Sequence, residues 1–101
     1  MAVEIPNSLN CLGAVKGADG TKLSGAGFSS GRSAKGVYTL TLDQPVDGSQ
    51  CSANATLRGG SAGMIELEHT SASVKTVKTF DNTGAAADSN FDFQILNCPN
   101  S

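Results

Sequence analysis

The chain has 101 residues, a formal net charge of −2, one histidine and three cysteines. This length supports one domain, and seven scattered cations against nine anions do not form the positive surface that nucleic-acid binding requires. No apolar stretch approaches the roughly 20 residues that span a bilayer, and residues 1–10 lack the basic and apolar regions of a secretory signal. We therefore expect neither a nucleic acid nor a membrane as a partner.

Bulky side chains are scarce in this sequence. Leu, Val, Ile and Phe together supply 21 residues, whereas Gly, Ser, Ala and Thr supply 44. Small domains are marginally stable, and a chain of this composition can build only a thin hydrophobic core. We expect the folded state to gain stability from association with other proteins.

The first part of the chain predicts an arm followed by short strands. Residues 1–10 contain Pro6 and precede the first alternating segment, so we predict an N-terminal arm over 1–10 and one β-domain over 11–101. Strand candidates at 12–15, 21–23 and 28–32 are separated by Gly-rich turns.

The second part of the chain shows clearer two-residue alternation, typical of strands. It predicts strands over 36–43, 51–57, 64–69, 73–80 and 91–95. Val74 and Val77 lie three residues apart and cannot share a face of a regular strand, so a bulge is predicted between them. The predicted core consists of the apolar residues on one face of these strands: Tyr38, Leu40, Leu42, Ile65, Leu67, Phe91, Phe93 and Ile95.

Seven or eight short strands spaced by turn signals, with almost no helical pattern, define the expected fold class. We predict an all-β protein with a single small antiparallel β-sandwich, like a jelly roll, and no second domain.

Few residues could carry catalysis. The only histidine, His69, follows Glu66 and Glu68, but on a strand these carboxylates point to the face opposite His69. No motif for a nucleophile, a zinc site or a phosphate loop is present. The sequence therefore predicts no enzyme, no catalytic residue, no metal and no cofactor.

The cysteines and acidic residues have structural interpretations. The three cysteines show no CxxC spacing: they are Cys11, Cys51 and Cys98. This spacing favours buried thiols, and one disulfide is the alternative. Asp88 opens a segment with oxygen side chains at alternate positions, but the Gly and Glu that a calcium-binding EF-hand loop needs are missing.

A protein-protein interface is the remaining kind of site. Arginine is well suited to interface ion pairs, and apolar residues outside the predicted core could contact a partner. The candidate interface residues are Met1, Val3, Ile5, Arg32, Arg58, Val77 and Phe80.

Four segments resemble a recurring pattern in small virion surface proteins of tailed bacteriophages. They are residues 25–32 (GAGFSSGR), 36–42 (GVYTLTL), 74–80 (VKTVKTF) and 88–96 (DSNFDFQIL). The resemblance covers about 70 residues, in the order of a strand, a loop and core strands. It implies a β-sandwich, commonly trimeric, of the kind found in head decoration proteins and fibre tips.

The resemblance also implies a function and partners. We expect a structural virion protein, made in the host cytoplasm, that binds and stabilises major capsid subunits as a head decoration or cement protein. The alternative is a trimeric, lectin-like receptor-binding tip of a tail fibre or spike. The partners would be the major capsid protein or a tail or fibre protein, and two further copies of this chain in a homotrimer.

Overall fold

The fold is seen in a computed structural model that describes residues 9–44, 52–58 and 63–96. These residues form strands and connecting turns, and no helix occurs among them. The strands are β1 (Leu9–Val15), β2 (Lys22–Ala26), β3 (Phe28–Ala34), β4 (Val37–Leu42), β5 (Ser52–Leu57), β6 (Gly63–His69), β7 (Val74–Asp81) and β8 (Phe91–Leu96).

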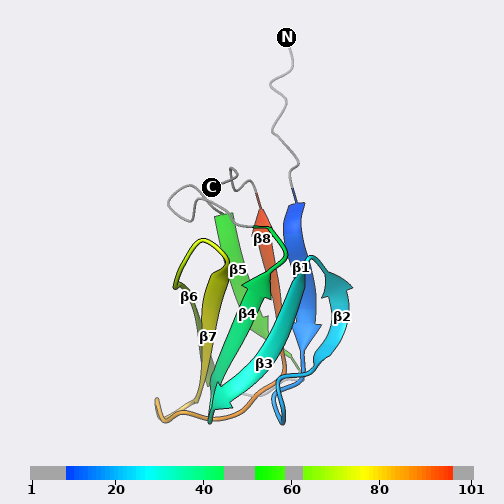
Figure 1. The fold of residues 1–101 in the computed structure, drawn as a ribbon. Helices are drawn as coiled ribbons and strands as arrows, with labels where there is room; N and C mark the ends of the chain where they lie inside the picture. The colour runs from blue at the N-terminus through cyan, green and yellow to red at the C-terminus, as the bar shows by residue number, and fades with distance from the viewer. Residues whose placement is uncertain (1–8, 45–51, 59–62, 97–101) are drawn as a thin grey trace.

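The eight strands form two four-stranded antiparallel sheets that pack face to face (Figure 1). Sheet A has the order β2-β1-β8-β5 and sheet B the order β3-β4-β7-β6. The predicted all-β sandwich of seven or eight short strands is therefore confirmed. The first strand begins at Leu9, two residues before the predicted start of the β-domain.

Strand pairing brings the two ends of the described chain together. β1 pairs with β8, and Leu9 lies opposite Leu96, so the chain enters and leaves at the same end of the sandwich (Figure 1). The orders β3-β4-β7-β6 and β5-β8-β1 match the two sheets of an immunoglobulin constant-type sandwich whose last strand is placed first in the chain. β2 adds a strand at the edge of sheet A.

The inner faces of the two sheets supply the core, because alternate residues of each strand point inward. The prediction for Tyr38, Leu40, Leu42, Phe91, Phe93 and Ile95 is confirmed, since all six are buried. Ile65 and Leu67 are half-buried and pack against them. The other apolar residues of this cluster are Cys11, Val15, Phe28 and Val77.

The predicted bulge between Val74 and Val77 is wrong. β7 pairs with β4 and with β6 in unbroken register, so Val74 and Val77 lie on opposite faces of the strand. Val77 is fully buried, and Lys75 shares its inward face. The irregularities lie elsewhere, for example between Ala14 and Val15 where β1 pairs with β2.

An aspartate ties the loop before β8 to the β3–β4 hairpin. The Asp88 carboxylate accepts hydrogen bonds from Arg32 Nε at 3.1 Å and from the Gly36 N–H at 2.7 Å, and it lies 3.2 Å from the Tyr38 hydroxyl. The Arg32 hydrogen bond and the Gly36 N–H hold the pKa of Asp88 below its ordinary value. The Tyr38 hydroxyl donates in turn to the Gly17 carbonyl at 2.9 Å.

The Asp88→Ala substitution is expected to lower the free energy of unfolding by about 1–2 kcal/mol, because the Gly36 N–H loses a charged acceptor. Asp92→Ala is the matched control: Asp92 pairs with Arg58 at 3.0 Å at the surface, so the expected cost is under about 0.5 kcal/mol. Urea denaturation measures both.

Since the pKa of Asp88 is lowered on folding, its contribution to stability is present above the pKa of the unfolded chain and is lost as the pH falls through the pKa of the folded protein. Equal losses for the two variants would contradict this role.

Candidate functional site

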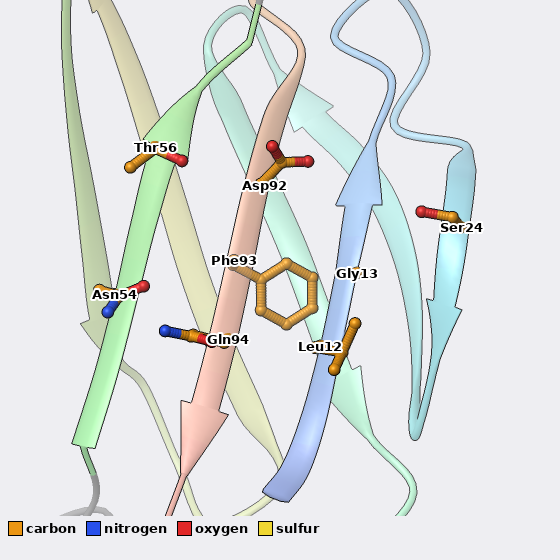
Figure 2. A pocket seen from close by; sticks show the side chains of 8 residues that line it. All are labelled: Leu12, Gly13, Ser24, Asn54, Thr56, Asp92, Phe93 and Gln94. Atoms are coloured by element: carbon orange, nitrogen blue, oxygen red, sulfur yellow. The ribbon is translucent and has the colours of Figure 1, made fainter.

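A groove lined by both polar and apolar groups crosses the outer face of sheet A (Figure 2). Its volume is about 430 Å³, and all four strands of the sheet contribute to it. The lining residues are Leu12, Gly13, Ser24, Asn54, Thr56, Asp92, Phe93 and Gln94.

Strand alternation explains why polar side chains gather in this groove. Asn54 lies opposite Gln94, and Thr56 lies opposite Asp92, where β5 pairs with β8. Their neighbours along the strands point into the core, so these four point outward, as Figure 2 shows. Leu12, which is 43% exposed, adds an apolar surface beside Gln94.

Two glycines bring β2 and the core close to β1 beside this groove. Gly13 lies opposite Gly25, and a Cβ at position 13 would come within 2.4 Å of the Phe28 ring. The Phe28 ring packs edge-on against Phe93, with a centroid distance of 4.7 Å. The floor of the groove is therefore close-packed backbone over aromatic rings.

The chemistry of the groove is that of binding. Asn54 and Gln94 offer amide donors and acceptors, and Thr56 offers a hydroxyl. The Asp92 carboxylate is paired with Arg58 at 3.0 Å, which neutralises the single charge in the groove. Such a surface can hydrogen-bond a neutral polar ligand or a protein backbone.

A second polar cluster lies at the β6–β7 hairpin, where the exposed residues His69 and Ser71 contact the buried Lys75. The Lys75 side chain is 1% exposed, and its amine lies 2.6 Å from His69 Nδ1 and 3.3 Å from the Ser71 carbonyl oxygen. Burial lowers the pKa of Lys75. Burial also raises the pKa of Cys11 to about 11, so this thiol is protonated at neutral pH and is not a nucleophile.

The Lys75→Met substitution is expected to raise the free energy of unfolding by about 1 kcal/mol, because Met fills a similar volume without the desolvation cost of an amine. Lys78→Met is the control: this exposed amine lies 3.3 Å from Glu68, and its loss should change stability by under about 0.5 kcal/mol. Thermal unfolding between pH 6 and 10 measures both. The pKa of Lys75 is lower in the folded protein than in the unfolded chain. The free energy of unfolding therefore rises as the pH rises toward the pKa of lysine in the unfolded chain. Lys75→Met should remove this pH dependence. A Lys75→Met protein less stable than Lys78→Met would contradict the prediction.

The predicted interface residues fall in different places. Arg32 and Arg58 form ion pairs within the chain, with Asp88 and Asp92. Val77 is fully buried and belongs to the core, so the described fold leaves it unavailable to a partner. Phe80 is half-buried on the outer face of sheet B, opposite Met64.

Other predicted residues are only partly described. Met1, Val3 and Ile5 lie outside the described residues, as do Cys51 and Cys98. Cys11 is a free, buried thiol, as the favoured interpretation predicted for it. Asp88, considered above as part of a calcium loop, instead binds Arg32 and Gly36.

The sequence did not predict the groove on sheet A. Alternation did predict that Asp92 and Gln94 point away from the core, but nothing local places Asn54 and Thr56 beside them. That juxtaposition depends on the pairing of β5 with β8, which lie far apart in the sequence.

Across residues 9–44, 52–58 and 63–96, no group of three or more His, Cys, Asp or Glu side chains could hold a metal ion. The same segments contain no helix with the length and apolar character needed to cross a membrane. No protein family, no curated protein and no solved structure matches this chain.

Proposed function

We propose that this chain is a structural protein of the virion surface, a decoration or cement protein that binds and stabilises major capsid subunits on a phage head. The observation that carries the proposal is a β-sandwich whose outer face displays an open groove with hydrogen-bonding side chains beside apolar ones. In the part of the chain that the structure describes, the histidine bonds a buried lysine and lies beside no activated nucleophile. The proposed location on the virion surface rests on the four segments that resemble phage surface proteins.

The fold suits a cement protein in two ways. Its outer faces carry polar side chains together with the exposed apolar residues Leu12 and Met64, and such faces can lie flat against a neighbouring subunit. Asp88 ties the loop before β8 to the β3–β4 hairpin, so little conformational entropy would be lost in these two segments on binding. In this proposal the segment before β1 anchors the domain, and three copies assemble at the attachment site.

The test adds purified protein to phage heads assembled without it and measures co-sedimentation and survival of heating or osmotic shock. We expect the protein to sediment with the heads and to raise their survival. A variant lacking residues 1–6 should attach more weakly while keeping the thermal unfolding midpoint of the full chain. Heads that neither bind the protein nor gain resistance would overturn the proposal.

A receptor-binding tip is the second candidate, and the groove is the observation that favours it. Amide, hydroxyl and carboxylate groups beside Leu12 could bind the hydroxyls and the apolar face of a sugar. A glycan array with the isolated protein tests this function. Gln94→Ala should abolish any binding, and Glu66→Ala, on the outer face of the other sheet, should not. If the protein binds no glycan at millimolar sugar concentrations, a simple lectin function is excluded.

A further inference from the structure

Within the part of the chain that the structure describes, one edge of β5 has no neighbouring strand. β5 pairs only with β8 among the described strands, in a register without a break from Ser52 to Leu57. The Arg58 N–H donates to the Asn90 carbonyl at 2.9 Å, on the side facing β8. In an antiparallel pair the hydrogen-bonding side alternates with each residue. The N–H and C=O groups of Ala53, Ala55 and Leu57 therefore point away from β8, toward the free edge.

The other three edge strands carry features that hinder the addition of another strand. On β3, Lys22 Nζ donates to the outward-facing Phe28 carbonyl at 3.1 Å and covers that part of the edge. β2 contains Gly25 at φ 109°, which interrupts the regular edge. β6 carries the charged residues Glu66 and Glu68.

β5 has none of these features within its described residues. Its sequence, SANATL, contains no charge, proline or glycine. Ala53, Asn54 and Thr56 are exposed, while Ala55 and Leu57 are half-buried, with Leu57 beside Gly63 of β6. An uncharged, regular edge is a template for a further strand.

We propose that β5 pairs antiparallel with β5 of a second copy, about a two-fold axis at Ala55. This register places Asn54 opposite Thr56 of the second copy on the outer face, so that an amide meets a hydroxyl. On the inner face it places Ala53 opposite Leu57 and Ala55 opposite itself, so that apolar side chains meet and the half-buried ones become covered. No like charges meet, because Arg58, beyond the strand, is already paired with Asp92.

The pairing joins sheet A of two copies into one eight-stranded sheet and places their two grooves side by side. A two-fold contact of this kind is self-complementary and closes with two copies. The inference concerns the isolated protein in solution, whereas the proposed trimer concerns copies attached to a virion. A trimer of the isolated protein would therefore contradict this pairing without contradicting attachment.

Charge variants of the full chain test the register. In Asn54→Lys/Thr56→Lys, each lysine faces a lysine of the second copy, whereas in Asn54→Lys/Thr56→Glu each lysine faces a glutamate. Both pairs of side chains project from the exposed outer face, so each monomer should fold. We expect a wild-type dimer by sedimentation velocity at high micromolar concentration. The dissociation constant of the Lys/Lys variant should exceed that of the Lys/Glu variant by at least roughly tenfold, because opposite charges across strands attract and like charges repel.

A backbone variant tests the edge itself. Ala55→Pro removes an N–H that points away from β8, so the pairing with β8 is kept while the free edge is blocked. We expect Ala55→Pro to be monomeric and Ala55→Ser, which keeps the N–H, to remain a dimer. If Ala55→Pro fails to fold, the charge variants decide. A wild-type monomer, a trimer, a folded Ala55→Pro dimer, or charge variants with equal dissociation constants would overturn the inference.

Discussion

Replacing Gly25 by Ala is expected to lower the free energy of unfolding by about 3 kcal/mol. Gly25 has φ 109°, a conformation that side-chain-bearing residues rarely adopt. A Cβ at this position would also lie 2.1 Å from the Leu12 carbonyl oxygen and 2.4 Å from the Gly13 Cα. These are backbone atoms of the paired strand β1, so the clash can be relieved only by moving the β1–β2 ladder. Urea denaturation monitored by circular dichroism measures the loss.

Gly31 provides the matched control for this substitution. It lies in the neighbouring strand β3, no heavy atom comes within 4 Å of a Cβ built there, and its φ is not positive. Gly31→Ala should therefore leave stability unchanged or raise it by about 0.4–1 kcal/mol, because alanine restricts the unfolded chain. A Gly25→Ala protein as stable as Gly31→Ala would show that β2 is not held against β1 in this register.

Replacing Phe93 by Ala is expected to cost about 3–5 kcal/mol, the range for deletion of a buried phenyl ring. Phe93 is 4% exposed and packs edge-on against Phe28, with its centroid 6.4 Å from that of Phe91. It is one of few large side chains in a thin core, so its neighbours can fill little of the space it leaves. Since a small domain has a total stability of about 5–15 kcal/mol, much of it would be lost.

Leu23→Ala is the control for Phe93→Ala, because Leu23 is a large apolar residue of sheet A that is 47% exposed. Its truncation should change the free energy of unfolding by under about 0.5 kcal/mol. Thermal unfolding of the two variants in the same buffer makes the comparison. If Phe93→Ala keeps the wild-type midpoint, the aromatic cluster does not hold the two sheets together.

Two-residue alternation predicted most of the strands and the core. Tyr38, Leu40 and Leu42 are buried as a set because β4 is an internal strand with one face on the core. The same alternation gave the inward faces of β6 and β8. The prediction worked because these strands have clear apolar and polar faces, which is the strongest local signal in a sheet.

Two-residue alternation gave a wrong prediction in β7, where a charged residue occupies the inward face. Lys75 lies on the inward face near the start of β7, and its buried amine lies within hydrogen-bond distance of His69 Nδ1 and the Ser71 carbonyl oxygen. The bulge was predicted because Val74 and Val77 lie three residues apart, whereas only Val77 lies inside and Lys75 shares its face. Propensity cannot reveal a polar partner supplied by another segment.

The candidate site and the loop contacts depend on long-range pairing. The Asp88 carboxylate reaches Arg32 and Gly36, which are more than fifty residues away in the sequence. The groove needs β5 beside β8 and β1 beside β2, and only the topology of the sheet fixes these neighbours. No spacing along one strand indicates them.

The adjacency of Leu9 and Leu96 determines how the domain responds to mechanical force. A pull on both ends of the described chain would open the β1–β8 ladder from that point, breaking its hydrogen bonds one after another rather than all together. Unzipping of this kind yields at low tension, whereas shearing two strands past each other loads many bonds at once. A β-sandwich with this connectivity resists force better when the force is applied to its faces and edge strands than when it is applied to its two ends.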